Sequence, residues 1–178
     1  PKALDQFYDA MKQDFVVQGA LMPDAHLGYS LPIGAVVATK GVVVPAWVGY
    51  DIGCGMCAVP TTFDHRDLVG LKADAIYDAI LRAVPVGFQH SKLSTEWPEY
   101  RGINKTPFLK KIFEDADAGF RQLGTLGGGN HFIEIGVDET EVVWIIIHSG
   151  SRNIGHKTAT HYMKLASGSN KAKEGHYG

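Results

Sequence analysis

The chain has 178 residues, of which 45% are hydrophobic, and its formal net charge is -2 at pH 7. This length and apolar share fit a globular protein with one sizeable core, or about one domain and a half. The charge argues against a protein coated in positive charge, so any nucleic-acid contact has to come from a local groove. No apolar run is long enough to cross a bilayer, and the acidic N-terminal region lacks a signal-peptide pattern. We expect a cytoplasmic protein with no membrane partner.

The cysteines exclude one class of fold. Cys54 and Cys57 are the only two, in the order Cys-Gly-Met-Cys, which excludes a disulfide framework. A redox pair and half a zinc site remain as alternatives, but a zinc ribbon needs a second pair and a thioredoxin-type pair should open a helix. Residues 56–63 instead have the pattern of a strand interrupted by Pro60. We therefore expect Cys57 to be a buried strand residue.

Hydrophobic spacing predicts the first elements of the chain. Residues 2–14 have helical spacing, and residues 15–21 have the pattern of a short strand that ends in a loop at residues 22–28. Residues 33–39 and 42–44 are apolar and β-branched, which predicts a hairpin or two consecutive strands. The expected apolar face of the first helix consists of Leu4, Phe7, Tyr8 and Met11.

An amphipathic helix is expected over residues 67–84, stopping before Pro85. Residues 86–107 mix Gly, Ser, Pro and charge, so they are the expected loop or insertion. A second helix is expected from Pro107 to about Gln122, with proline in its first turn. The expected buried stripe of the helix at 67–84 consists of Leu68, Leu71, Ala75, Ile76, Ala79 and Ile80.

Two strands and a third helix complete the prediction. The strands cover residues 132–137 and 142–147 and are joined by an acidic turn, and the helix covers residues 154–166. The predicted fold class is α/β (mixed α+β), with sheets and packed helices in a single incomplete domain. Since the chain begins at Pro1 without Met and its last five residues form no closing element, we expect a part of a longer protein.

The segment Asp51-Ile52-Gly53-Cys54-Gly55 carries the strongest chemical signal. Its carboxylate offers a hard oxygen and its thiolate a soft sulfur that can bridge two ions, while the glycines let both side chains turn toward one point. The pattern therefore favours a metal site, with room for two ions. The alternative is a glycine turn with a capping Asp51 and a buried free Cys54.

A second signal is His131, at the start of a strand-like segment. In a regular strand Asn130, Phe132 and Glu134 share one face and His131 points to the other, so neighbouring residues could serve two subsites. A ring, an amide and a carboxylate on one face suit a purine. The alternative is a strand-start histidine with Phe132 in the core.

His148 is placed at the carboxyl end of an apolar strand, where open α/β sheets collect ligands. The following residues 149–153 lead into a helix, and Arg152 can add a bidentate phosphate contact, so we expect an anion site. The alternative is a Ser-rich helix cap with a surface arginine. Asp24 and His26, in a turn, could orient a metal ligand from outside the coordination shell.

The remaining charged residues give weaker signals. The other histidines have no comparable context and are expected at the surface or in packing contacts. The lysines near the expected loop and second helix, and those near the end of the chain, fit solvated faces or contacts along a phosphate backbone. These residues are His65, His90, His156, His161 and His176, and Lys105, Lys110, Lys111, Lys164, Lys171 and Lys173.

Four of these motifs together resemble the RtcB-type RNA-splicing ligases in order and spacing. Four motifs in register are far more specific than any one of them. The resemblance covers nearly the whole chain but only about the N-terminal half of that family's length. The matching motifs are Met22-Pro23-Asp24-Ala25-His26-Leu27-Gly28, Gly49-Tyr50-Asp51-Ile52-Gly53-Cys54-Gly55, Leu126-Gly127-Gly128-Gly129-Asn130-His131-Phe132-Ile133-Glu134 and His148-Ser149-Gly150-Ser151-Arg152.

The resemblance implies an RtcB-like fold and a GTP- and Mn2+-dependent ligase. Such an enzyme joins RNA 3'-phosphate or 2',3'-cyclic phosphate ends to 5'-hydroxyl ends, in tRNA splicing or RNA repair, and an activating protein would be a further partner. Two manganese ions are implied, with Cys54 bridging, although zinc, iron or cobalt also suit these ligands. The residues it assigns are Asp51, Cys54, His131 and His148 to the metals, Asn130, Phe132 and Glu134 to the guanylate, and Arg152 to a phosphate.

One departure from the family limits this expectation. No residue of the chain matches the motifs of the family's guanylylated histidine or of a further metal-binding histidine. We therefore expect weak metal binding and no ligation by this chain alone. Two other functions stay open: a metal-dependent phosphoesterase without a nucleotide, and a non-catalytic fragment or degenerate paralogue that binds RNA or protein.

Overall fold

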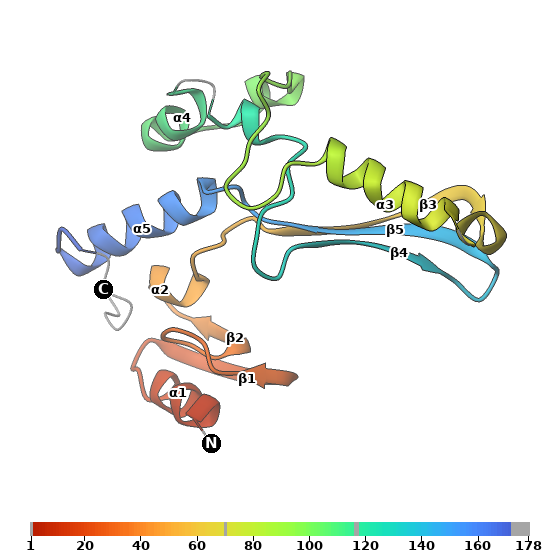
Figure 1. Cartoon of the computed structure of the whole chain (residues 1–178). Helices are drawn as coiled ribbons and strands as arrows, with labels where there is room; N and C mark the ends of the chain where they lie inside the picture. Colours follow the sequence, from red (N-terminus) through yellow and green to blue (C-terminus); the bar gives the residue numbers. More distant parts are fainter. Residues whose placement is uncertain (1, 70, 116–117, 172–178) are drawn as a thin grey trace. The chain divides into compact units, whose positions relative to one another are not determined.

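The computed structural model describes residues 2–69, 71–115 and 118–171 of the chain. The chain divides into two compact units, one formed by Pro1–Ile52 with Lys157–Gly178 and the other by Gly53–His156. Helices and strands both contribute to the fold (Figure 1), so the predicted mixed α/β class is confirmed. Among the described residues, no helix combines the length and the apolar character that a membrane span requires.

The first unit contains a two-stranded antiparallel sheet, β1–β2, and the helix α1 that precedes it. A Cβ atom at Gly19 of β1 would lie 2.5 Å from Met11 Sδ and 2.9 Å from Phe7 Cζ of α1. The absence of a side chain at Gly19 allows this close approach, which confirms the predicted apolar face at Phe7 and Met11, whereas the predicted Leu4 and Tyr8 are exposed. The elements are α1 (Lys2–Met11), β1 (Val16–His26), β2 (Ile33–Thr39), α2 (Pro45–Val48) and most of α5 (Ile154–Ser167).

The buried core of the first unit lies between α2 and α5. Ala46 of α2 is 6% exposed, and Ala159 and Met163 of α5 are 0% and 2% exposed. Tyr50 and Ile52 pack against them. The helix predicted at residues 154–166 is thus confirmed, and its apolar positions reach back to a segment about a hundred residues earlier in the chain.

Two predictions for the first unit are wrong. The strand β1 continues to His26, so most of the predicted loop at residues 22–28 belongs to the sheet. Residues 42–44 form no strand, and β2 pairs with β1 instead. The Thr39 hydroxyl donates to the Val42 carbonyl at 2.6 Å, so a nearby side chain rather than a neighbouring strand holds this carbonyl, and α2 begins at Pro45.

The second unit contains a three-stranded antiparallel sheet in the order β3-β5-β4. The central strand β5 comes from the strongly apolar run, and its Val143 is 2% exposed. The three strands were expected from their apolar runs, and each is confirmed. The elements are β3 (Gly55–Asp64), α3 (Leu71–Ala83), α4 (Pro107–Glu114), β4 (Phe132–Val137), β5 (Val142–Ser149) and the short 3-10 helices η1 (His65–Leu68), η2 (Pro98–Gly102) and η4 (Phe120–Gln122).

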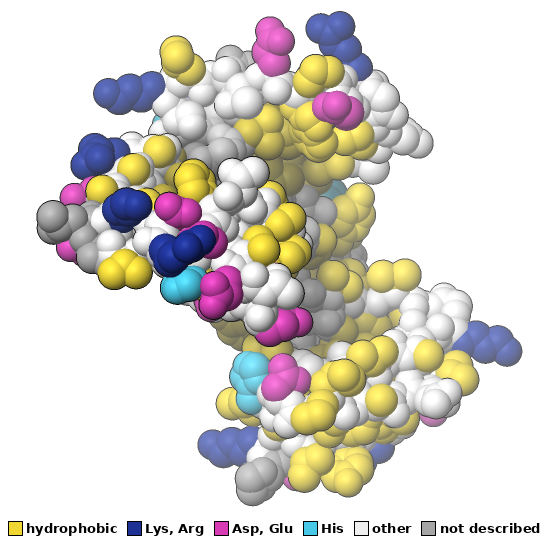
Figure 2. Space-filling view, turned by 90° about the vertical axis from the view of Figure 1, so that its right-hand side faces the viewer, with side chains coloured by type: hydrophobic (Ala, Val, Ile, Leu, Met, Phe, Trp, Pro, Cys, Tyr) yellow, Lys and Arg dark blue, Asp and Glu magenta, His cyan; other side chains and the backbone are white. Residues whose placement is uncertain are grey.

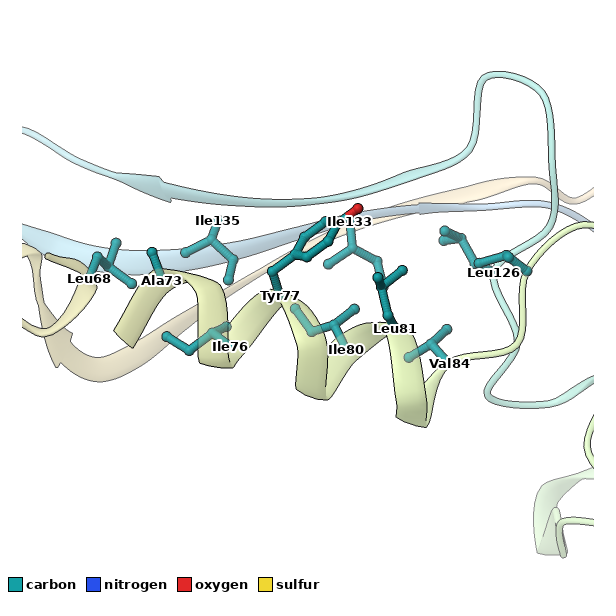
Figure 3. A pocket seen from close by; sticks show the side chains of 11 residues that line it. Leu68, Ala73, Ile76, Tyr77, Ile80, Leu81, Val84, Leu126, Ile133 and Ile135 are labelled. Carbon is teal, nitrogen blue, oxygen red and sulfur yellow. The ribbon is translucent and has the colours of Figure 1, made fainter. Parts of the chain in front are cut away.

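Helix α3 lies along this sheet and leaves a pocket of about 390 Å³ between them (Figure 3). Ile76 and Ile80 of α3 and Ile133 and Ile135 of β4 line it. The helix is only partly covered, since Tyr77 is 63% exposed; Figure 2 shows hydrophobic side chains at the surface in yellow. Of the predicted stripe, Leu68, Ile76 and Ile80 line the pocket, Ala75 and Ala79 are exposed, and the Leu71 side chain lies outside the described part.

Helix boundaries in the second unit differ from the prediction. The Asp67 carboxylate accepts a hydrogen bond from the Asp64 backbone at 3.0 Å, which caps η1, and α3 begins only at Leu71. Helix α4 ends at Glu114 rather than near residue 122. The expected loop at residues 86–107 contains η2 within irregular backbone.

The prediction that Cys57 is buried is wrong. Both cysteines are exposed. The reason is topological: Cys57 pairs with Ile147 on the side of β5 opposite to β4, so β3 is an edge strand, and residues 55–60 are all exposed. An apolar strand pattern therefore indicated the correct element but not its burial.

The β4–β5 turn is held by one carboxylate. Asp138 accepts hydrogen bonds from the Trp144 indole N–H at 2.8 Å, from the Thr140 backbone and hydroxyl at 2.8 Å, and from the Val142 backbone at 3.0 Å. These bonds, the indole bond foremost, lower the pKa of Asp138 from 3.8 to about 2. The turn that positions both strands therefore prefers an ionised Asp138.

This pKa gives the stability of the hairpin a defined pH dependence. Because the folded pKa lies below the unfolded one, the stabilisation is fully present above pH 3.8 and is lost as the pH falls toward about 2. We predict that the stability of the unmodified chain, followed by far-UV circular dichroism, falls over this window and that the stability of Asp138→Asn falls less. Arg66 lowers the pKa of Asp64 to about 2 as well, so part of the pH dependence of stability remains in Asp138→Asn. Glu139→Gln, in the same turn, serves as control; equal acid sensitivity of Asp138→Asn and the unmodified chain would contradict the assignment.

Candidate functional site

The sheet register places His148 at the centre of the candidate site. His148 of β5 lies directly opposite Phe132 of β4 on one side and Met56 of β3 on the other. Directly opposed residues of antiparallel strands project to the same face. The His148 and Phe132 rings lie 5.6 Å apart, centroid to centroid, at 76°. An imidazole and a phenyl ring therefore lie side by side at one end of the sheet.

A second imidazole joins them. The His131 ring lies 5.1 Å from the His148 ring, with the two planes at 80°. The prediction that strand alternation separates His131 from Phe132 is wrong, because β4 begins at Phe132 and His131 precedes it. Both rings consequently lie beside His148, and any subsites that they serve adjoin.

Glycines make room for the His131 ring. A Cβ atom at Gly150 would lie 2.6 Å from His131 Cε1, and one at Gly127 would lie 2.7 Å from His131 Nδ1. Gly127 also has a φ of 110°, which disfavours other residues. The backbone reinforces this approach, since the Gly150 N–H donates to the Leu126 carbonyl at 2.9 Å. The glycine run and the segment after β5 thus close around His131.

Cys54 is brought to the same end of the sheet. It directly precedes Gly55, and Gly55 pairs with Ser149, the neighbour of His148. Its side chain is exposed, as access by a metal requires. Asp51 is exposed and belongs to the first unit, whereas Cys54, His131 and His148 belong to the second.

The residues of the second unit fit a metal in part. Two imidazoles on one ion, each at roughly 2.1 Å, place their ring centroids on the order of 5 Å apart. The 5.1 Å between His131 and His148 agrees with that spacing. Within the described residues, no three His, Cys, Asp or Glu side chains form a group that could hold an ion. The spacing of the two imidazole rings therefore allows a shared ion, and the metal site itself, with Asp51 and Cys54, stays a prediction.

The proposed guanylate residues lie next to the imidazoles. Phe132 is 37% exposed, and Glu134 is exposed two positions along β4. The intervening Ile133 and Ile135 line the α3 pocket (Figure 3), so the alternation expected for Phe132 and Glu134 is confirmed. Asn130 is exposed but precedes the strand, so the pleat does not fix its direction.

Arg152 is a structural clamp as well as a candidate phosphate contact. Its Nε donates to Thr125 Oγ1 at 2.7 Å and to Gln122 Oε1 at 3.1 Å. Its Nη2 donates to the carbonyls of Gly87 at 2.8 Å and Gln89 at 2.9 Å. The backbone of Arg152 is left-handed, with a φ of 52°. Such a conformation persists where surrounding contacts hold it, and these four hydrogen bonds do so.

The clamp residues Gln122 and Thr125 carried no signal in the sequence. Thr125 is 6% exposed, and its hydroxyl also donates to the Gln122 carbonyl. The two residues are polar and common in loops, and nothing in their spacing pairs them with an arginine 27 or 30 positions later. The glycines around His131 did carry a signal, because Gly127 and Gly150 both belong to the motifs that resemble the family.

His148 does not lie at the carboxyl edge of an open α/β sheet, so this prediction is wrong. The sheet is antiparallel, and His148 lies within β5 rather than after it. The predicted anion site at the following helix stays a prediction. Asp24 and His26 lie near the end of β1 in the first unit, where the His26 Nδ1 donates to the Asp24 carbonyl at 2.9 Å. Their role beside a metal also stays a prediction.

The clamp predicts that Arg152→Ala loosens the loops around His131. Hydrogen bonds from a charged donor contribute about 1.5–3 kcal/mol each, and truncation leaves the nearly buried Thr125 hydroxyl without this donor. We expect amide hydrogen exchange at residues 86–89 and 124–129 to accelerate by at least about tenfold. Arg121→Ala, which removes a bond to Ser91, is the control. Unchanged exchange at these loops in Arg152→Ala would show that the guanidinium does not hold them.

Comparison with known proteins identifies relatives of this chain. The family model described as tRNA-splicing ligase RtcB matches residues 6–111 and 94–177. The RNA-splicing ligase RtcB of Escherichia coli strain K12 is 38% identical over 183 residues, covering 92% of this chain and 44% of the relative. The tRNA-splicing ligase RtcB of Pyrobaculum aerophilum is 36% identical over 192 residues, covering 82% and 40%.

The tRNA-splicing ligase RtcB of Thermococcus kodakarensis is 29% identical over 228 residues, covering 94% of this chain and 47% of the relative. The chain thus spans less than half the length of these relatives. The resemblance seen in the four motifs is confirmed, because the family model matches nearly the whole sequence. This chain belongs to the RtcB family of RNA-splicing ligases.

Proposed function

We propose that this chain forms the metal- and guanylate-binding part of an RNA ligase that depends on GTP and Mn2+. The ligase would join 3'-phosphate or 2',3'-cyclic phosphate RNA ends to 5'-hydroxyl ends, in tRNA splicing or RNA repair. The observation that carries the proposal is the pair of adjacent imidazoles, His131 and His148, beside the exposed Phe132 ring. Membership of a family of RNA-splicing ligases supports RNA as the substrate.

The metal-binding role falls to side chains at one end of the sheet. His131 and His148 would hold an ion through neutral ring nitrogens, and Cys54, at the start of β3, would add a thiolate able to bridge to a second ion. Asp51 would supply a hard oxygen. When bound, divalent ions neutralise the charge of a transferring phosphoryl group.

The guanylate role falls to β4. Phe132 offers a ring face for stacking, and Glu134 lies two residues along the same strand face, roughly 7 Å away. A carboxylate there would accept hydrogen bonds from the amide and amine edge of guanine, while the Asn130 amide could meet the carbonyl edge. Arg152, whose Nε and Nη2 donate to Gln122 and Gly87, would bring its guanidinium charge to a phosphate.

Cobalt provides a direct test of the ligands. We predict that Co2+ bound to the chain gives a thiolate charge-transfer band that Cys54→Ser removes and Cys57→Ser keeps. The two cysteines form a matched pair, since both are exposed and lie three residues apart. His131→Ala and His148→Ala should each weaken Co2+ and Mn2+ binding by more than about tenfold, and His90→Ala should not. A band that survives Cys54→Ser would exclude this cysteine as a ligand.

Guanine recognition is tested separately from metal binding. We predict that Glu134→Gln weakens GMP binding by about ten- to a hundredfold, as expected when a charged hydrogen-bond acceptor is lost. Glu139→Gln, at the opposite end of the β4 strand, is the control. If phosphate esters protect the fold and GMP does not, a metal-dependent phosphoesterase becomes the better assignment.

The chain alone should not form a covalent intermediate. After incubation with GTP and Mn2+, we expect mass spectrometry to find no GMP adduct, because no residue matches the family's guanylylated histidine. A stable adduct would contradict this expectation. His156 and His161, and His176 outside the described residues, would then be tested by substitution. RNA binding that ignores chelators and survives Asp51→Ala would favour a non-catalytic binding fragment.

A further inference from the structure

The segment between α3 and η4 forms an aromatic cluster of its own within the second unit. The Tyr100 ring stacks on Phe113 at 4.6 Å and meets Phe120 edge-on at 5.1 Å. Trp97 lies 5.8 Å from Tyr100 and 5.9 Å from Phe113. Tyr100 is 7% exposed, and its hydroxyl donates to Glu114 at 3.2 Å. The cluster gives this otherwise irregular segment a rigid floor.

Two hollows open on this floor, and they share three side chains. One measures about 460 Å³ and the other about 440 Å³. Tyr100, Arg101 and Phe120 line both, so the hollows adjoin at the aromatic floor. Arg101 itself is exposed and stands where the hollows meet.

The chemistry of the two hollows differs. The first is lined by the Trp97 ring, the Ser94 and Thr95 hydroxyls and the Glu96 carboxylate, a mixture of ring surface and hydrogen-bonding groups. The second is lined by the cations of Arg101, Lys105 and Lys110 and by one carboxylate, Glu114, which accepts a hydrogen bond from the Tyr100 hydroxyl, so its cations outnumber its anion by three to one. The first hollow suits a planar heterocycle with polar edges, and the second suits a phosphate.

Lys105 is held in position for such a contact. Its ammonium lies 4.1 Å from the Tyr100 ring centroid and donates to the Ile103 carbonyl at 2.7 Å and to the Tyr100 carbonyl. An ordered cation loses little side-chain freedom when an anion binds. Lys110, one helical turn into α4, and Arg101 are exposed and complete the positive edge.

We propose that these two hollows bind a nucleotide of single-stranded RNA, the base against Trp97 and Phe120 and the phosphate against Arg101, Lys105 and Lys110. Ring surfaces beside a basic groove are the usual means of holding single strands. An acidic peptide would satisfy the second hollow but leave the rings and hydroxyls of the first unused. The choice of RNA rests on the proposed function, whereas the hollows themselves lie outside the residues assigned to metal and guanylate.

The test measures binding of a labelled single-stranded RNA oligonucleotide by fluorescence anisotropy, with EDTA present and GTP absent. Under these conditions RNA binding at the hollows is measured without metal or guanylate binding. The result can therefore be interpreted even if the proposed roles of His131 and Glu134 prove wrong. Arg101→Glu with Lys110→Glu should weaken binding at least about tenfold. The slope of log affinity against log salt should become shallower by about 1.4, from two phosphate contacts at about 0.7 each. Arg82→Glu with Lys40→Glu, both at exposed positions, is the charge-matched control.

A second measurement does not depend on folding of the variants. RNA carrying a photoreactive pyrimidine should crosslink to residues 94–101 of the unmodified chain, and the peptide is identified by mass spectrometry. Equal losses in the two charge-reversed pairs, or crosslinks confined to other segments, would overturn the proposal. Complete displacement of the RNA by an equal charge of polyglutamate would also overturn it, because it would identify a general acidic-peptide surface.

Discussion

The pairing of β5 with a strand on each side is the constraint on which the candidate site depends. Antiparallel register is fixed by hydrogen bonds on both edges, so Met56, His148 and Phe132 form one row across the sheet. A shift by one residue would turn His148 to the face that α3 covers and expose the isoleucines instead. The imidazole pair and the exposed phenyl ring are thus consequences of the same register that turns the half-buried Ile133 and Ile135 toward α3.

Much of this arrangement was predictable, because it follows from local patterns. The apolar runs indicated all three strands of the second unit, and they indicated that His131 would lie at the start of one of them. The four motifs together also identified the family that the comparison confirmed. Strand existence and motif identity are encoded within short windows of sequence, so they need no knowledge of tertiary contacts.

The features that could not be predicted from the sequence depend on contacts between residues that are far apart in the chain. The prediction that Cys57 is buried was wrong because an edge strand and a central strand have the same apolar pattern. Only the order of the strands in the sheet distinguishes them. The prediction that His131 and Phe132 point to opposite faces of a strand was wrong because β4 begins at Phe132, one residue later than expected. The role of Arg152 in holding Gln122 and Thr125 could not be predicted, because the neighbouring sequence does not distinguish an arginine that holds loops from one that binds a phosphate.

The polar contacts carry unusual weight because the apolar interior of the second unit is small. Within the described part of this unit, the hydrophobic side chains classed as buried are Tyr100 and Val143, and α3 leaves a pocket against the sheet. Apolar burial therefore cannot by itself hold the long loops in one arrangement. The carboxylate of Asp138 orders the turn at one end of β5, and the guanidinium of Arg152 orders the loops at the other. Since the second of these ends carries His148 and faces His131, the geometry of the imidazole pair should respond to Arg152 more than to any single apolar contact.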